Sequence, residues 1–210
     1  MTVSTLFAPA HGPKPTSARE VAQLYATDIA AERTRMLYQG SQVPTLFMLL
    51  SGVACAFLLW GVLPPVLLVS WSVWLVILAV LRLVQVRAFN NASPSRQAER
   101  HWRRLFLFGA AASGLTLAFA AIVLVPADVF YLQALVYGLI AAAILSASVA
   151  YAISFSAFLT FVLPCLLPTV SYLLLSQSPL QRGWGLLSSI LLLALLVVAW
   201  QVNRLVQRSL

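Results

Sequence analysis

Charged side chains are scarce in this sequence, with thirteen Lys and Arg and five Asp and Glu among 210 residues, or 9%. Soluble domains carry about 25% charged residues on average. The sequence also contains long segments without any charge: residues 36–81, 105–127, 129–181 and 183–203. Because a helix of about 20 apolar residues crosses the bilayer core, each segment is long enough for one or two crossings. The composition therefore excludes an ordinary soluble domain and predicts a polytopic membrane protein.

Residues that support catalysis or metal binding are also scarce. The chain has two histidines and two cysteines, and His11 and His101 fall in a predicted tail and a predicted loop. No ionisable residue falls near the middle of a predicted span, which argues against a pump, a proton-coupled transporter or a voltage sensor. Neither an H-E-x-x-H metal motif nor a glycine-rich phosphate loop is present. We therefore expect no cofactor, no metal and no catalysis by this chain itself.

The basic residues are the main charged feature that remains. The net charge is +8, and four arginines gather in SPSRQAERHWRR, residues 93–104. A nucleic-acid surface is one explanation of such a cluster, and a topological anchor beside a membrane is the other. The apolar composition favours the anchor, so we expect no nucleic-acid partner.

Six hydrophobic helices account for the uncharged segments. The apolar runs are continuous, which excludes the alternating pattern of a membrane β-barrel strand, and the prolines after residues 63 and 125 end two of them. The predicted fold is all-α, a six-transmembrane-helix bundle within residues 43–203, with spans at about 43–63, 65–86, 105–125, 129–151, 154–175 and 183–203. A five-span alternative treats residues 129–175 differently.

The distribution of arginine predicts the orientation, because Lys and Arg are retained on the cytoplasmic side of bacterial membranes. With six spans, only Arg182 falls on the far side, and the other basic residues precede the first span, flank the second loop or follow the last span: Lys14, Arg19, Arg33, Arg35, Arg82, Arg87, Arg96, Arg100, Arg103, Arg104, Arg204 and Arg208. We therefore expect a bacterial inner-membrane protein with both termini in the cytoplasm.

The segments outside the bundle have their own patterns. Residues 1–16 are rich in proline and polar residues and are predicted to be a disordered cytoplasmic tail. Residues 17–40 begin with a capping-box spacing and continue with apolar residues on one helical side, which predicts an amphipathic interfacial helix. Residues 204–210 continue the last span without a helix breaker and are predicted to start a cytoplasmic linker helix.

A pair of prolines marks the best candidate for a ligand site. Pro164 and Pro168 lie four residues apart in the fifth span, where each removes a backbone hydrogen bond and bends the helix. A bent helix leaves room for a pocket. The polar residues proposed to contact a small apolar or neutral ligand there are Gln133, Tyr137 and Tyr172.

Two further features have both a packing and a ligand interpretation. Trp71 and Trp74 lie deeper in the second span than tryptophans at a membrane interface, so they either pack between helices or line a ligand cavity. Small residues spaced four apart, Ala110 with Gly114 and Gly138 with Ala142 and Ser146, predict close helix approach.

Several stretches resemble bacterial membrane input domains that precede GGDEF-type diguanylate cyclase, EAL phosphodiesterase or histidine kinase modules. These stretches are ERTRMLYQGSQVP, LLWGVLPP, HWRRLFLFGAAASGL and SFSAFLTFVLPCLLPTVSYLL, within about residues 30–208. The resemblance implies an inner-membrane sensory region, usually dimeric through its output domain. The effector domain itself is not among these residues.

The leading hypothesis is a sensory or anchoring domain whose last helix passes a membrane or small-molecule signal to a cytoplasmic effector. Its expected partners are membrane lipid, a second copy of the chain, a small ligand and the effector. Two alternatives remain, a transporter or channel for a small neutral solute and an accessory subunit of a membrane complex.

Overall fold

The computed structural model describes residues 34–93, 100–126, 129–152 and 154–209. The described residues form helices and their connections, with no strand among them. The helices are α2 (Gln42–Leu58), α3 (Pro65–Asn91), α5 (Arg100–Val123), α6 (Phe130–Tyr151), α7 (Phe155–Leu175) and α8 (Pro179–Ser209). The all-α prediction is confirmed, and the break between α6 and α7 excludes the five-span count.

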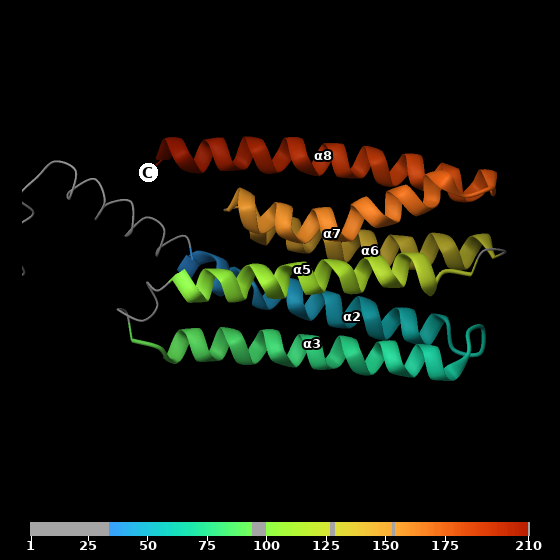
Figure 1. The fold of residues 1–210 in the computed structure, drawn as a ribbon, viewed down its shortest axis with the longest axis horizontal. Coiled ribbons are helices and arrows are strands. Elements are labelled where there is room, and N and C mark those ends of the chain that lie inside the picture. The colour runs from blue at the N-terminus through green and yellow to red at the C-terminus, as the bar shows by residue number, and fades with distance from the viewer. Residues whose placement is uncertain (1–33, 94–99, 127–128, 153, 210) are drawn as a thin grey trace, which may run out of the picture.

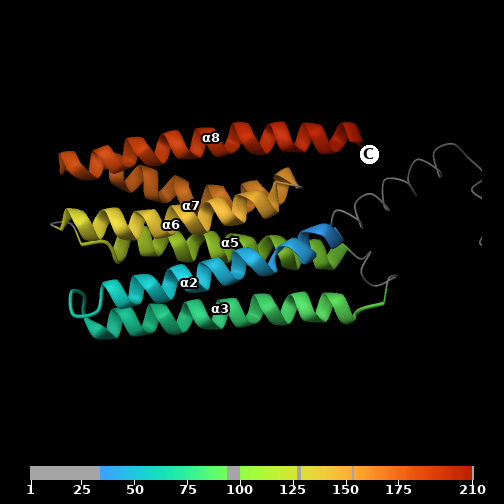
Figure 2. The ribbon, with the colours of Figure 1, turned by 180° about the vertical axis from the view of Figure 1, so that it is seen from behind.

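Successive helices run antiparallel along one common direction, as Figures 1 and 2 show. The start of α2 and the end of α8 therefore lie at the same end of the bundle. We call this the arginine-rich end, because the segments that meet there carry Arg35, Arg87, Arg103, Arg104 and Arg204. The opposite end holds the connections α2–α3, α5–α6 and α7–α8, and we call it the turn end.

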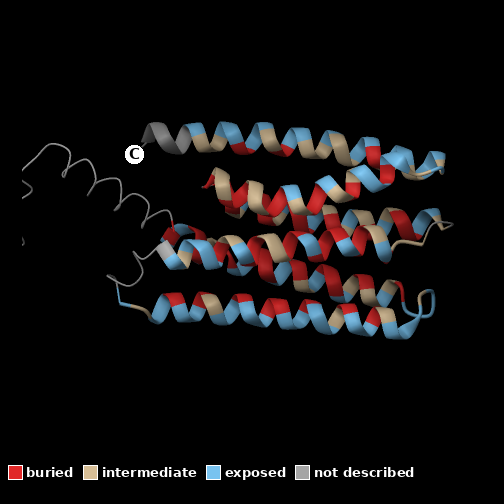
Figure 3. Cartoon of the chain, in the orientation of Figure 1, coloured by how far each residue is buried: buried red, intermediate tan, exposed pale blue. Residues whose placement is uncertain are grey.

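Neighbours in space differ from neighbours in sequence. The main packed pairs are α5 with α7, α7 with α8, α2 with α6 and α2 with α3. Buried residues concentrate where α2, α5, α6 and α7 face one another, whereas α3 and α8 form the two outer edges (Figure 3). α8 packs chiefly against α7, so α8 has the largest surface that no other described helix covers.

The exterior of the bundle is apolar over its length. Large side chains such as Phe57, Val66, Val149 and Leu175 are about four-fifths exposed, although soluble proteins rarely leave wide apolar surfaces uncovered. Six helices are long and apolar enough to cross a bilayer: Thr34–Leu58, Pro65–Asn91, His101–Val123, Phe130–Tyr151, Phe155–Leu175 and Pro179–Arg204. These are the properties of a multi-pass membrane protein.

The segment before the first span is only partly described. Residues 17–33 of the predicted interfacial helix, and the tail 1–16, lie outside the described residues. Residues 34–40 are helical and continue into α2 with a single turn residue, Ser41. Leu37 and Tyr38 on this segment are buried in the core, so this part of the predicted interfacial helix belongs to the bundle.

Several helices extend further than the hydrophobic runs that predicted them. α3 ends at Asn91 rather than at residue 86, and α8 runs on to Ser209 over the residues where a linker helix was predicted to start. Each added residue continues the backbone hydrogen bonding of a helix that is already formed, so propagation past the apolar run is favourable. One residue of α3 departs from its predicted place, because Arg82 was predicted to flank the following loop. Arg82 lies inside the helix and is only 4% exposed.

Candidate functional site

α7 contains the two prolines and bends along its length. Pro164 and Pro168 both lie inside the helix, so the backbone bonds from their nitrogens to Thr160 O and Pro164 O are missing. Figure 1 shows the C-terminal half of α7 rising toward α8, while its N-terminal half lies deeper in the bundle. Because of the bend, the C-terminal half of α7 approaches α8, while its N-terminal half lies among the inner helices.

Gly114 on α5 allows the backbone of α7 to approach α5 closely. A Cβ atom placed on Gly114 would overlap the carbonyl oxygen of Phe161 and lie 3.3 Å from the backbone nitrogen of Cys165. The two backbones are thus in direct contact one turn from Pro164, which is the close approach that the spacing of Ala110 and Gly114 predicts. This contact anchors the middle of α7 to α5 and leaves its opposite side to α6 and α8.

A groove of about 430 Å³ lies on that opposite side. Its size falls in the range of ligand sites, about 300–1,000 Å³. α6 and α8 form its walls, and α5 and α7 contribute the remaining residues; the lining is Ala121, Ala134, Tyr137, Gly138, Ile140, Ala141, Ile144, Cys165, Leu166, Thr169, Trp184, Leu187, Ser188, Ile190, Leu191 and Ala194. The groove is open to the outside of the bundle, since Leu187 and Ile190 are 57% and 65% exposed.

Small residues on α6 create much of this space. Gly138 lines the groove, and a Cβ atom added to it would meet nothing within 4 Å. Ala134 and Ala141 lie one turn to either side on the same wall. The spacing of Gly138 with Ala142 and Ser146 predicts close packing against another helix, and at Gly138 this prediction is wrong: the glycine faces open space.

Aromatic and amide groups close the groove at the turn end. The Trp184 indole Nε1 donates a hydrogen bond of 3.1 Å to Gln133 Oε1. Gln133 is fully buried, and its Nε2 donates to the carbonyl oxygen of Pro126 at 2.9 Å. The Trp184 ring lies 5.2 Å from the Tyr137 ring and 6.2 Å from the Phe130 ring, measured between centroids. This aromatic group has the composition of a membrane–water interface.

The polar groups of the lining are mostly occupied by other protein atoms. Tyr137 Oη donates to Ala121 O at 3.2 Å, and Thr169 Oγ1 donates to Cys165 O at 2.8 Å. With the Trp184 indole also bonded, Ser188 is the one polar lining side chain that makes no hydrogen bond within the described part of the chain. A polar solute would find few partners here, so the groove suits an apolar ligand.

The seven predicted site residues separate into two groups. Tyr137 lines the groove, and Gln133 positions Trp184 at its end. Pro164 and Pro168 lie next to lining residues of α7 without lining the groove themselves. Tyr172 is 46% exposed and lies outside the lining.

Trp71 and Trp74 lie on α3, away from the groove. Trp71 is buried in the core, where its indole nitrogen has no partner among the described residues. Trp74 donates to Thr116 Oγ1 on α5 at 3.1 Å. Trp71 therefore packs between helices, whereas Trp74 is 52% exposed and is held to α5 by its hydrogen bond. Trp184 is the tryptophan at the groove.

A second polar feature lies nearer the arginine-rich end. Arg82 Nη2 donates to Tyr151 Oη at 2.7 Å, and Arg82 Nη1 donates to Phe106 O at 3.2 Å. The guanidinium carbon lies 4.7 Å from the centre of the Phe106 ring. No carboxylate belongs to the described residues, because all five lie elsewhere in the sequence: Glu20, Asp28, Glu32, Glu99 and Asp128. Neutral groups therefore supply every contact that the structure shows for this charge.

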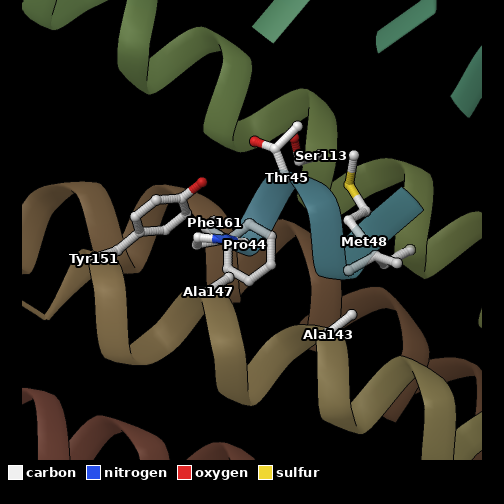
Figure 4. A pocket seen from close by; sticks show the side chains of 9 residues that line it. Pro44, Thr45, Met48, Ser113, Ala143, Ala147, Tyr151 and Phe161 are labelled. Carbon is white, nitrogen blue, oxygen red and sulfur yellow. The ribbon is translucent and has the colours of Figure 1, made fainter. Parts of the chain in front are cut away.

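The cavity beside Tyr151 is small. Pro44, Thr45, Met48, Ser113, Ala143, Ala147, Tyr151 and Phe161 surround it in Figure 4, with Leu117 completing the lining. Its volume of about 10 Å³ is that of a single water-sized probe, which leaves no space for an organic ligand. The groove between α6 and α8 is therefore the better candidate for a ligand site.

No family model matches the chain, and neither a curated protein nor a solved structure is found to be similar to it.

Proposed function

We propose that this chain is the sensory and anchoring region of a bacterial membrane signalling protein. An apolar ligand occupies the groove between α6 and α8, and the last helix passes the change to a cytoplasmic effector. A diguanylate cyclase or a histidine kinase is the effector class favoured by the sequence resemblance. Two copies of the chain would bring two such effectors together.

The observation that carries the proposal is the position of α8. This helix of 31 residues lines the groove from Trp184 to Ala194 and continues to Ser209 at the arginine-rich end. It packs chiefly against the bent α7. A ligand that changes the spacing of α6, α7 and α8 would therefore move α8 with little repacking elsewhere.

Such a ligand acts only if it binds two arrangements of the bundle with different affinity. The groove meets this condition because it depends on the bend of α7 and on the separation of α8 from α6. An arrangement with α8 moved toward Gly138 would close the groove and lose the ligand contacts. Ligand binding then favours the open arrangement in proportion to the contacts that it makes.

The test is a fusion of a diguanylate cyclase reporter after residue 210, with cyclic-di-GMP measured per inserted chain. Gly138→Leu fills the groove, whereas Gly183→Leu is a matched control because a Cβ atom there also meets nothing within 4 Å and the residue lies outside the groove. Allosteric coupling is usually 1–3 kcal/mol, so we expect Gly138→Leu to change the output about five-fold or more. Equal output from the two variants would reject the sensory role of the groove.

The orientation is a separate part of the proposal. Arg35 before α2, Arg87 of α3, and Arg103 and Arg104 of α5 lie at the end of the bundle where α8 finishes, and this supports a cytoplasmic position for that end. An alkaline phosphatase fused after residue 210 should be inactive, because it folds only in the periplasm, and a β-galactosidase at the same position should be active. An active alkaline phosphatase together with an inactive β-galactosidase would place the effector in the periplasm and contradict the proposed orientation.

The transporter alternative has less support from the same geometry. A path for a neutral polar solute needs polar groups that are free to bind it, and the groove offers mainly apolar side chains. Solute flux measured in liposomes tests this alternative. The accessory-subunit alternative is tested by recovery of a stoichiometric complex in mild detergent.

A further inference from the structure

The groove has the length of one bilayer leaflet. It runs along α6 from Ala134 to Ile144 and along α8 from Trp184 to Ala194. Ten residues of helix extend about 15 Å, which is half of the hydrocarbon core of about 30 Å. The long axis of the groove is parallel to the helices, because both walls are lined along the helix direction. A single extended hydrocarbon chain has this shape and orientation.

We propose that the groove binds one acyl chain of a phospholipid from the leaflet at the turn end. This inference rests on the proposed function, since it names the ligand class of the same groove. The chain enters sideways between α6 and α8, where Gly138, Leu187 and Ile190 are exposed. No polar group has to cross the hydrocarbon, because the headgroup stays at the membrane surface.

The turn end of the groove fits the headgroup region of such a lipid. Trp184, Tyr137 and Phe130 gather there, as aromatic residues do at membrane interfaces. Arg182 is exposed in the first turn of α8, two residues before Trp184. It is the one basic residue at this end of the described chain, and its charge attracts the phosphate of a phospholipid. A neutral isoprenoid quinone has carbonyl oxygens that can accept a hydrogen bond from Arg182, but it has no negative charge for the guanidinium to attract.

Dispersion contacts, rather than hydrophobic transfer, favour binding of the acyl chain in the groove. A chain that moves from lipid into the groove stays in hydrocarbon, so hydrophobic transfer contributes little. The gain is dispersion contact with side chains that otherwise face a void. Small lining residues leave space for the chain, with Gly138 and Ala141 on α6 and Ala194 on α8. A larger side chain at any of these positions occupies the space of the chain.

The test is native mass spectrometry of the full chain from vesicles of dioleoyl phosphatidylglycerol, transferred to mild detergent. We expect one retained lipid per chain in the wild type and in Gly183→Leu. In Gly138→Leu we expect roughly ten-fold lower retention. Both variants are first checked for helix content and for a single oligomeric species. Ala194→Leu, which fills the groove from α8, is used if Gly138→Leu does not fold.

A second arm separates the acyl chain from the headgroup. Dihexanoyl phosphatidylglycerol has the same headgroup and chains too short for the groove, so it should not be retained. Arg182→Gln should lower the retention of the dioleoyl lipid without abolishing it. Equal retention of the two lipids, or of the dioleoyl lipid by Gly138→Leu, would overturn the acyl-chain site. Displacement of the lipid by a long-chain isoprenoid quinone would also overturn it and would make the quinone the occupant.

These measurements are independent of signalling. If the wild type retains the lipid and Gly138→Leu leaves the reporter output unchanged, the proposed sensory function is rejected and the lipid site remains intact. A changed reporter output in Gly138→Leu, with no lipid retained by the wild type, would reject the lipid and leave the sensory function intact.

Discussion

Arg82 and Tyr151 are 69 residues apart in sequence and are joined inside the bundle by a hydrogen bond of 2.7 Å. The bond connects the outer helix α3 with the end of α6, just before the turn into α7. Arg82 is 4% exposed and Tyr151 is 2% exposed. A buried guanidinium whose contacts in the described part of the chain are all neutral depends strongly on each acceptor that it has.

Tyr151→Phe should therefore destabilise the protein markedly. The substitution keeps the ring and removes the oxygen that accepts from Arg82 Nη2, and hydrogen bonds to charged groups contribute about 1.5–3 kcal/mol. We expect a loss of that size in the free energy of unfolding, measured by circular dichroism in mixed micelles with increasing sodium dodecyl sulfate. Tyr131→Phe is the control, because Tyr131 is 64% exposed, and it should have little effect.

The charge of Arg82 is what makes this oxygen important. In an Arg82→Met background the guanidinium is absent, so Tyr151→Phe should cost much less than it does in the wild type. We expect a coupling energy of about 1.5 kcal/mol or more from the complete double-mutant cycle. Additive effects of the two substitutions would show that the Tyr151 hydroxyl is needed for another reason.

Gly109 makes room for Arg82 on α5. A Cβ atom at Gly109 would lie 2.6 Å from Arg82 Nη1 and 2.9 Å from Arg82 Cδ, so Gly109→Ala should displace the side chain from both acceptors. We expect destabilisation of about 1–3 kcal/mol, although alanine is the better helix former. Gly183→Ala, which meets open space, should be neutral or slightly stabilising. In an Arg82→Ala background the cost of Gly109→Ala should disappear; a cost that persists would implicate the helix backbone instead.

The six helices were predictable because each uncharged run is long enough to span a bilayer, and that signal is local. The position of Arg82 was not predictable in the same way. The positive-inside rule places an arginine near a helix end outside the membrane, and only the tertiary structure shows that Arg82 points toward Tyr151. No sequence spacing relates these two residues.

The groove illustrates the same limit. Small residues four apart occur at both Gly114 and Gly138, yet Gly114 contacts the α7 backbone and Gly138 faces open space. The spacing predicts that another helix can approach closely. Whether one does depends on how the helices pack in the folded bundle. The prolines of α7 did predict a bend, because a missing backbone donor is a property of the residue itself. Trp184 carried no local signal that related it to Gln133.

Gly114→Ala should be among the most damaging single substitutions in the bundle. The added methyl group would overlap a backbone oxygen of α7, which cannot move aside as a flexible side chain can. We expect a loss of about 2 kcal/mol or more in the free energy of unfolding, by the same micelle titration. Gly138→Ala is the matched control and should be tolerated, since its methyl group enters the groove. Similar behaviour of the two variants would mean that α5 and α7 do not pack backbone to backbone.

Replacing both prolines of α7 tests what produces the bend. Pro164→Ala with Pro168→Ala restores two backbone donors, so we expect α7 to straighten. The distance between spin labels at Phe155 and Leu175, in a background with Cys55→Ser and Cys165→Ala, should increase toward the about 30 Å of a straight helix with twenty residues between them. Pro179→Ala is the control, because a proline in the first turn of α8 interrupts no helical hydrogen bond. An unchanged distance would show that packing against α5 and α8 holds the bend without the prolines. In that case Gly114, rather than the proline pair, sets the shape of the groove.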